Sequence, residues 1–163
     1  MERKYRLLFV CLGNICRSPA AETIMCEVVK KAGLQDVIEC DSAGTYGGHA
    51  GERADARMRR AAAERGYDIT HISRPVRSSD FDLSDMIIAM DDNNYETLYR
   101  LAPSIEASEK IFRMTEFCRR YAGRRYVPDP YYEGAEGFFL VLDMLEDACE
   151  GLLDYLKGKI IEC

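Results

Sequence analysis

Short apolar runs that alternate with amphipathic stretches constrain the fold of this chain more than any other feature of its sequence. Residues 7–10 and 86–90 contain only Leu, Ile, Val, Phe, Met and Ala. Runs of this length without alternating polar residues are typical of strands that are covered on both faces, as parallel strands are. Residues 37–43 and 110–112 are weaker strand candidates.

Helical periods lie between these runs. An apolar face within 21–29 predicts a helix that ends before Gly33, and an Arg- and Ala-rich helix is expected from about Glu52 to Gly66. A third helix should begin near Asp91 or Asp92 and end before the proline at position 103. The clearest apolar stripe is the last one, formed by Phe138, Val141, Leu142, Leu145, Ala148, Cys149, Leu152, Leu153 and Leu156.

This order of strands and helices predicts an α/β fold in which parallel strands are joined by right-handed crossovers. The sheet should lie in the middle of a three-layer sandwich, with helices on both faces. We find no internal repeat or linker, so residues 1–163 are expected to form a single domain. Ligands of such folds bind beyond the carboxyl ends of the strands, which directs attention to the segment after Val10.

Charge and cysteine content limit the possible partners and the compartment. With 22 Lys and Arg against 28 Asp and Glu, the net charge is −6, which disfavours nucleic acid and anionic membranes as partners but allows small anions. Seven cysteines are an odd number and do not form a disulfide framework. No stretch approaches the roughly 20 apolar residues that a membrane helix needs. We therefore expect a cytoplasmic protein.

The segment Cys11–Pro19 follows the first strand and leads into the first helix. Ser18 is predicted to cap this helix and Pro19 to occupy its first position. Unpaired backbone N–H groups at a helix start, with the positive end of the helix dipole, form an anion cradle. Gly13 lets the backbone approach a ligand, and Asn14 tolerates unusual dihedral angles. The segment suits a tetrahedral oxyanion.

Two side chains of this segment, Cys11 and Arg17, would turn the cradle into a catalyst. Cys11, at the end of the strand, would lie at the floor of the cradle, where the N–H groups, the helix dipole and Arg17 favour its thiolate. Arg17 offers a planar fork that matches two phosphoryl oxygens. Ser18 could donate a hydrogen bond to the sulfur and help it to leave. The chemistry predicted is nucleophilic attack of a thiolate on phosphorus.

Simpler interpretations of the same residues remain open at this point. A buried cysteine is often a small apolar side chain, and a Gly-Asn pair is often only a turn. Cys11 and Cys16 could be metal ligands together with Cys26, Cys40 or His49, but the spacing lacks the paired cysteines of structural zinc sites. A Walker loop is absent. We expect neither a metal nor a cofactor.

The chain resembles the low-molecular-weight protein tyrosine phosphatases, whose signature is Cys-x5-Arg-Ser/Thr near the amino terminus. The matching blocks, in the order of the family, are Cys11–Pro19, Asp41–Thr45, Met90–Asn94 and Asp129–Tyr132. The resemblance implies a four-stranded parallel sheet and a two-step hydrolysis of phosphomonoesters through a phosphocysteine. It also implies tyrosine-phosphorylated proteins as substrates, with inorganic phosphate or analogous oxyanions binding in the same site.

The last block supplies a second catalytic group. Asp129 lies between Pro128 and Pro130, which should hold it on a stiff, extended loop. By resemblance, Asp129 protonates the departing phenolic oxygen and then, as a base, activates the water that cleaves the phosphocysteine. Tyr131 and Tyr132 would line the cleft.

The resemblance assigns the remaining site residues. Asn14, Ser42 and His71 match positions that brace the phosphate loop by hydrogen bonds. The residues expected to bind substrate are Leu12, Gly13, Asn14, Ile15, Cys16, Ser18, Tyr46, Tyr131 and Tyr132.

Two positions bear on substrate choice. Relatives commonly carry a bulky aromatic residue where this chain has Gly48, so a wall of the cleft would be missing unless Tyr46 replaces it. Ile15 favours phosphotyrosine over phosphoarginine, because arginine phosphatases of the family usually have threonine there.

Three alternative functions stay open: a protein arginine phosphatase, an arsenate reductase and a phosphotyrosine-binding module without turnover. Arsenate reductases on this fold carry a cysteine pair in the stretch that corresponds to 82–89, which here has no cysteine. A binding module should have lost Cys11, Arg17 or Asp129, and all three are present.

The neighbouring thiols suggest a regulatory hypothesis. If the sulfurs of Cys11 and Cys16 can meet, peroxide would form a reversible disulfide that shields the nucleophile. Phosphorylation of Tyr131 or Tyr132 is a further possibility that the family suggests.

Overall fold

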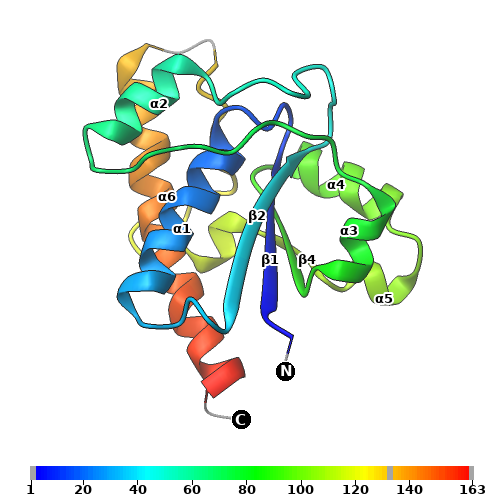
Figure 1. Ribbon diagram of the computed structural model, residues 1–163. Coiled ribbons are helices and arrows are strands. Elements are labelled where there is room, and N and C mark those ends of the chain that lie inside the picture. Colours follow the sequence, from blue (N-terminus) through cyan, green and yellow to red (C-terminus); the bar gives the residue numbers. More distant parts are fainter. Residues whose placement is uncertain (1–2, 132–133, 162–163) are drawn as a thin grey trace.

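The computed structural model describes residues 3–131 and 134–161, and their core is a parallel sheet (Figure 1). The four strands are arranged in the order β2-β1-β3-β4, and every neighbouring pair is parallel. The predicted parallel sheet is confirmed. The strands are β1 (Tyr5–Cys11), β2 (Ile38–Gly44), β3 (Met86–Ala89) and β4 (Ile111–Arg113).

Helices cover both faces of this sheet (Figure 1). One face carries α1 (Arg17–Lys31) and α6 (Ala135–Leu156), with α2 (Ala56–Ala63) beside them. On the other side lie α3 (Ser78–Leu83), α4 (Asp92–Leu101) and α5 (Ile105–Ser108). A 3₁₀ turn at Met114–Phe117 follows β4, and a π-helical turn at Lys157–Ile161 follows α6. The predicted three-layer sandwich is thus confirmed.

The apolar run of β1 is explained by burial on both faces. Leu7, Phe9 and Cys11 belong to the core cluster formed with α1 and α6, whereas Leu8 and Val10 belong to the cluster formed with α3 and α4. Successive side chains of a strand point to opposite faces, so both sets must be apolar. Within the described residues, no helix combines the length and apolar content that crossing a membrane requires.

Two predicted helix starts were wrong. The Arg- and Ala-rich helix begins at Ala56 rather than near Glu52, because the Asp55 side chain caps it by accepting a hydrogen bond from the backbone N–H of Arg57. Glu52 instead pairs with Ser73 through the backbone. The predicted stop is close to the observed one, since α2 ends at Ala63 and a short turn follows it to position 66.

The first helix also begins earlier than predicted. Its first residue is Arg17 and its N-cap is Cys16, so Ser18 does not cap the helix and Pro19 lies in its first turn. The hydroxyl of Ser18 is turned toward Cys11 and Asn14 instead. The predicted limits of α4 are confirmed, since Asp91 caps its start and it ends before the proline at position 103.

The strand order places a ligand site at the end of β1. This strand lies between β2 and β3, so the connections that leave β1 and β2 run to opposite sides of β1. Such a reversal opens a crevice at the carboxyl ends of the strands. The loop that connects β1 to α1 lies at this crevice.

Candidate active site

The loop between β1 and α1 surrounds the sulfur of Cys11 with polar groups. Cys11 is the last residue of β1 and is 2% exposed. Its Sγ lies 3.0 Å from the Oγ of Ser18, in the first turn of α1. The start of α1 has no side-chain cap, so its first N–H groups are left for an anion.

The side chain of Asn14 fixes this loop through hydrogen bonds to neighbouring segments. Its φ of 57° lies in the left-handed region, which Asn tolerates better than most residues. The Nδ2 of Asn14 donates to the Oγ of Ser18 (2.8 Å) and of Ser42 (3.1 Å). Its Oδ1 accepts hydrogen bonds from the backbone N–H of Arg74 (3.0 Å) and from Nε2 of His71 (2.9 Å). The amide side chain is therefore fully satisfied, and the unusual backbone angle is held in place.

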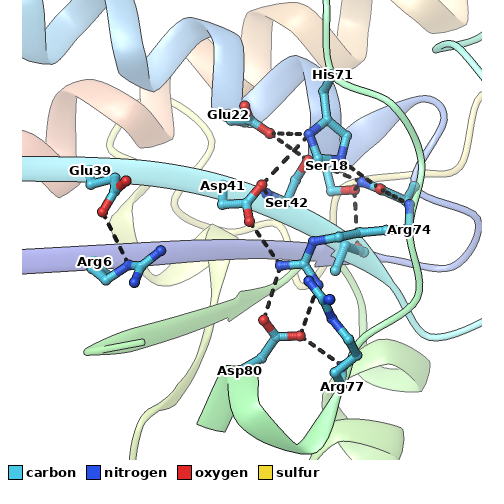
Figure 2. A network of polar contacts seen from close by, with 12 residues as sticks. Arg6, Ser18, Glu22, Glu39, Asp41, Ser42, His71, Arg74, Arg77 and Asp80 are labelled. Atoms are coloured by element: carbon cyan, nitrogen blue, oxygen red, sulfur yellow. Dashed lines mark hydrogen bonds and ion pairs between the residues drawn. The ribbon is translucent and has the colours of Figure 1, made fainter. Parts of the chain in front are cut away.

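His71 is in turn held by two carboxylates (Figure 2). Its Nδ1 lies 3.0 Å from Oε1 of Glu22 and 3.6 Å from Oδ1 of Asp41. The hydroxyl of Ser42 donates to the same Glu22 oxygen at 2.7 Å. Both ring nitrogens of His71 therefore face acceptor oxygens. Glu22 was not singled out from the sequence, since nothing local marks it among the other helix carboxylates.

Among the described residues, Glu22, Asp41 and His71 are also the group whose ligand atoms, all within 4.8 Å of one another, could hold a metal ion. The guanidinium of Arg74 already pairs with Asp41 at 2.8 Å and with Asp80 at 3.0 Å (Figure 2). These cationic and hydroxyl partners already engage the carboxylates of the cluster.

Arg17 lies beside the loop with its guanidinium buried. Nη1 donates to Oδ2 of Asp91 (2.7 Å) and to the carbonyl of Val127 (3.1 Å), and Nη2 lies 3.5 Å from Oδ2 of Asp129. Burial alone would lower the pKa of Arg17, but Cys11, Asp91 and Asp129 together raise it. The guanidinium is therefore a fixed cation next to the Cys11 sulfur.

Asp91 has a structural role that sequence reasoning missed. It follows β3 and caps α4 by accepting a hydrogen bond from the N–H of Asn94 at 2.8 Å, and its second oxygen orients Arg17. The signal was its place at the end of a predicted strand, on the same edge of the sheet as Cys11.

Asp129 approaches the site from the far end of the chain. Its carboxylate is 43% exposed and accepts a hydrogen bond from the N–H of Tyr131 at 3.1 Å. The flanking Pro128 and Pro130 restrict the backbone on both sides.

These groups open into one cavity of about 240 Å³. The residues that line it are Cys11, Leu12, Gly13, Ile15, Cys16, Arg17, Tyr46, His49, Asp129 and Tyr131. Among the predicted site residues, Asn14, Ser18, Ser42 and His71 do not line this cavity but form the polar network that supports the loop. Tyr132 lies outside the described residues.

Tyr46 and His49 form the wall next to Gly48. A Cβ atom on Gly48 would lie 2.2 Å from ring atoms of Tyr46, so the Tyr46 ring covers the glycine. The ring of His49 lies 6.3 Å from that of Tyr46 and 6.5 Å from that of Tyr131. His49 had been considered only as a metal ligand, and its place in the cleft was not predicted from the sequence.

Cys16, the second thiol of the loop, is 4% exposed. Burial raises the pKa of Cys16, and the charges of Asp55 and Cys11 raise it further. This thiol is therefore protonated at neutral pH, which leaves Cys11 as the nucleophile candidate of the loop. The disulfide between the two remains a prediction.

The chain is similar to proteins of one family over nearly its whole length. Residues 6–161 match the family model described as low molecular weight phosphotyrosine protein phosphatase. A low molecular weight protein-tyrosine-phosphatase of Streptomyces coelicolor is 41% identical over 157 residues, covering 96% of both chains. Low molecular weight phosphotyrosine protein phosphatase 1 of Drosophila melanogaster is 41% identical, covering 91% of this chain and 94% of that protein.

A solved structure shows the same fold. The crystal structure of a protein tyrosine phosphatase from Entamoeba histolytica, with Hepes in its active site, has a TM-score of 0.92 and 51% identity. The match covers 96% of this chain and 100% of that one. This chain therefore belongs to the low molecular weight protein tyrosine phosphatases.

Proposed function

We propose that this protein hydrolyses phosphotyrosine in proteins, with Cys11 as the nucleophile, Arg17 as the oxyanion ligand and Asp129 as the general acid and base. The observation that carries the proposal is that these three side chains line one cavity although Asp129 lies far from Cys11 and Arg17 in the sequence. The family supports the reaction type.

In the first step, the phosphoryl oxygens bind the N–H groups of the loop and the guanidinium of Arg17. The thiolate of Cys11 attacks phosphorus from the floor of the cavity, and the phosphorus–oxygen bond to the phenol breaks. Asp129 donates a proton to the leaving oxygen. The fixed cation and the N–H groups stabilise the charge on the equatorial oxygens in the transition state.

In the second step, water replaces the sulfur. Asp129, now ionised, takes a proton from the attacking water, and inorganic phosphate forms as the phosphorus–sulfur bond breaks. The hydroxyl of Ser18, 3.0 Å from the sulfur, stabilises the departing thiolate. The cycle as proposed uses side chains, the backbone N–H groups of the loop and water.

The walls of the cavity support an aryl substrate. Tyr46, His49 and Tyr131 supply rings to the lining, and so do apolar side chains of the loop, including Ile15. Rings of this kind favour a flat aromatic group between them. The Entamoeba structure holds Hepes, a sulfonate, in its active site, which supports oxyanion binding at the corresponding place in this chain. Tyrosine-phosphorylated proteins are therefore the proposed partners.

The cysteines support a location in a reducing compartment. All six described cysteines are free thiols, and the proposed nucleophile needs to stay reduced. A cytoplasmic location is part of the proposal.

Product assays with the purified chain test the function. We expect release of phosphate from para-nitrophenyl phosphate and from a phosphotyrosine peptide, with much slower release from phosphoserine and phosphoarginine peptides. Cys11→Ser should lower the rate by about 10⁴-fold or more, because the hydroxyl is not ionised. An arsenate-dependent loss of thiols in the same preparation would favour the reductase, and full activity of Cys11→Ser would contradict the mechanism.

A further inference from the structure

Arg57, the second residue of α2, lies against two aromatic side chains from a distant part of the sequence. The Cζ atom of its guanidinium is 5.2 Å from the centre of the Tyr131 ring and 4.9 Å from the centre of the Phe138 ring. Phe138 is buried in the first turn of α6, and α2 lies beside this end of the helix (Figure 1). A guanidinium within about 6 Å of a ring centre is attracted to the face of the ring. Arg57 therefore connects α2 to both aromatic side chains.

Asp55 fixes the orientation of this guanidinium. Nε of Arg57 donates to Oδ1 of Asp55 at 3.1 Å, and Nη2 donates to Oδ2 at 2.9 Å. Two parallel hydrogen bonds between a guanidinium and a carboxylate restrict the plane of the guanidinium as well as its position. The side chain of Asp55 is 12% exposed, so this ion pair is screened less by water and salt than a surface ion pair is.

Asp55 is itself attached to the loop between β1 and α1. Its backbone N–H donates to the carbonyl of Ile15 at 2.8 Å, and Ile15 lines the active-site cavity. The side chain of Asp55 also caps α2. The guanidinium of Arg57 therefore has a fixed place relative to the loop that surrounds the Cys11 sulfur.

Tyr131, the aromatic partner at the active site, belongs to the segment of the proposed proton donor. Its backbone N–H donates to Oδ1 of Asp129 at 3.1 Å, and both side chains line the active-site cavity. Both residues are partly exposed. Packing constrains such a segment less than it constrains the buried loop. A contact that restrains the Tyr131 ring thus also restrains the position of Asp129.

The next arginines of α2 do not make these contacts. Nε of Arg59 donates to the carbonyl of Ala54 at 2.9 Å, close to its own position in the sequence. Arg60 is exposed, and its side chain forms no hydrogen bond or ion pair within residues 3–131 and 134–161. Arg60 is therefore a matched control for the removal of a positive charge from this helix.

We propose that Arg57 is a positioning residue, which holds the Tyr131 ring and the Asp129 carboxyl in place relative to the loop of Cys11. Arg57 does not line the cavity, so it acts through Tyr131. Without it, the aromatic group of the substrate and the proton donor lose their alignment, whereas the anion site formed by the loop stays intact. The inference rests on the proposed function.

Steady-state kinetics of Arg57→Gln with two aryl phosphates test this role. The variant loses the charge and the ion pair with Asp55. We expect KM for para-nitrophenyl phosphate to rise about threefold. We expect kcat to fall about tenfold for phenyl phosphate but only about twofold for para-nitrophenyl phosphate, because the poorer leaving group depends more on the proton from Asp129. Inhibition by inorganic phosphate should not change. Arg60→Gln should match the parent in every one of these measurements.

Two further variants test whether the effect is transmitted by Tyr131. Arg57→Lys keeps the cation but cannot form both hydrogen bonds to Asp55, so its kcat for phenyl phosphate should lie between those of the parent and Arg57→Gln. When Tyr131→Leu is already present, adding Arg57→Gln should lower kcat for phenyl phosphate by less than about twofold, since the ring through which Arg57 acts is absent.

Binding of benzylphosphonate, an aryl phosphonate that is not hydrolysed, separates this inference from the proposed function. Calorimetry should show binding about threefold weaker for Arg57→Gln than for the parent, and unchanged binding for Arg60→Gln. This measurement requires no turnover. A parent protein that hydrolyses neither aryl phosphate would contradict the proposed function, whereas equal affinity of the parent and Arg57→Gln for benzylphosphonate would contradict the role of Arg57.

Three kinetic results would also overturn the inference. Equal losses of kcat for both aryl phosphates, with weaker inhibition by inorganic phosphate, would mean that Arg57 supports the loop or the fold as a whole. Parent kinetics in Arg57→Gln would mean that Arg57 has no role in the reaction. The same loss with and without the Tyr131 ring would mean that Arg57 does not act through Tyr131.

Discussion

The loop at residues 11–18 supplies the nucleophile and the anion site of the proposed reaction, and the segment around Asp129 supplies the proton donor. The two regions differ in how deeply they are buried. Within the loop and the first turn of α1, Cys11, Asn14, Arg17 and Ser18 are all at most 2% exposed. Ser18 hydrogen bonds to Cys11 and Asn14, and Arg17 hydrogen bonds to Asp91 and to the carbonyl of Val127. The carboxylate of Asp129 is 43% exposed. The anion site is thus buried and preorganised, whereas the proton donor is partly exposed to solvent.

This difference predicts two kinds of mutational effect. A buried polar network loses more than one interaction when one member is removed, because its partners stay buried and unsatisfied. Substitutions in the loop should therefore lower both stability and turnover. Substitution of Asp129 should lower turnover alone.

The largest effect in this comparison is expected for Arg17→Lys, which keeps the charge but loses the planar fork. A lysine cannot hold two phosphoryl oxygens, Asp91 and the carbonyl of Val127 in the same plane. We expect kcat/KM for para-nitrophenyl phosphate to fall by about 10³-fold. Retention within tenfold of the parent rate would show that charge alone is sufficient and that the fork has no special role.

Asp129→Ala is expected to be next in size. Loss of the proton donor should lower kcat by about 10²-fold for phenyl phosphate, a poor leaving group, and by less for para-nitrophenyl phosphate. The free energy of unfolding should change by less than about 0.5 kcal/mol, since the side chain is at the surface. Equal losses for both substrates would contradict the assignment of Asp129 as the acid.

Asn14→Ala tests how much the buried hydrogen-bond network of the loop contributes to stability and turnover. The variant removes one hydrogen bond each from Ser42, His71 and the N–H of Arg74 in a buried network, so we expect a loss of about 2–3 kcal/mol in unfolding free energy. Turnover should fall about tenfold as the loop loosens. Asn93→Ala, an exposed asparagine on α4, is the matched control and should change neither quantity. If turnover stays at the parent rate while stability falls as expected, the hydrogen bonds of Asn14 do not contribute to catalysis.

The smallest effect is expected for Gly48→Ala. The added methyl group would displace the Tyr46 ring from the rim of the cleft, so KM for aryl phosphates should rise about threefold with little change in kcat. Inhibition by inorganic phosphate should not change, because the anion site is deeper. Gly47→Ala is the control, since its methyl group would meet Pro75 at an ordinary 3.5 Å. The same KM for both variants would mean that Tyr46 does not contact substrate.

Local patterns in the sequence were sufficient for the sheet and for the position of the loop. The run at 7–10 must be covered on both faces, and a buried strand followed by a helix leaves free N–H groups at their junction. Sequence patterns were not sufficient to predict which distant residues contact the loop. Arg17 meets Asp91 across 74 positions of sequence, and no periodicity marks such a pair.

The error at Ser18 has a related cause. A serine before a proline is a good cap when only the helix is considered. Here the hydroxyl is turned to Cys11 and Asn14, and the helix begins at Arg17 rather than Pro19, without a side-chain cap. The local rule fails where the side chain is needed by the site.

Trapping of the covalent intermediate tests the central claim most directly. The protein is mixed with ³²P-labelled aryl phosphate, quenched on the millisecond scale and digested with trypsin. The account predicts one transient label per molecule, bonded to the sulfur of Cys11 within peptide 7–17 and absent from Cys11→Ser. Turnover at the normal rate without a labelled protein, or with the label on another peptide, would contradict it.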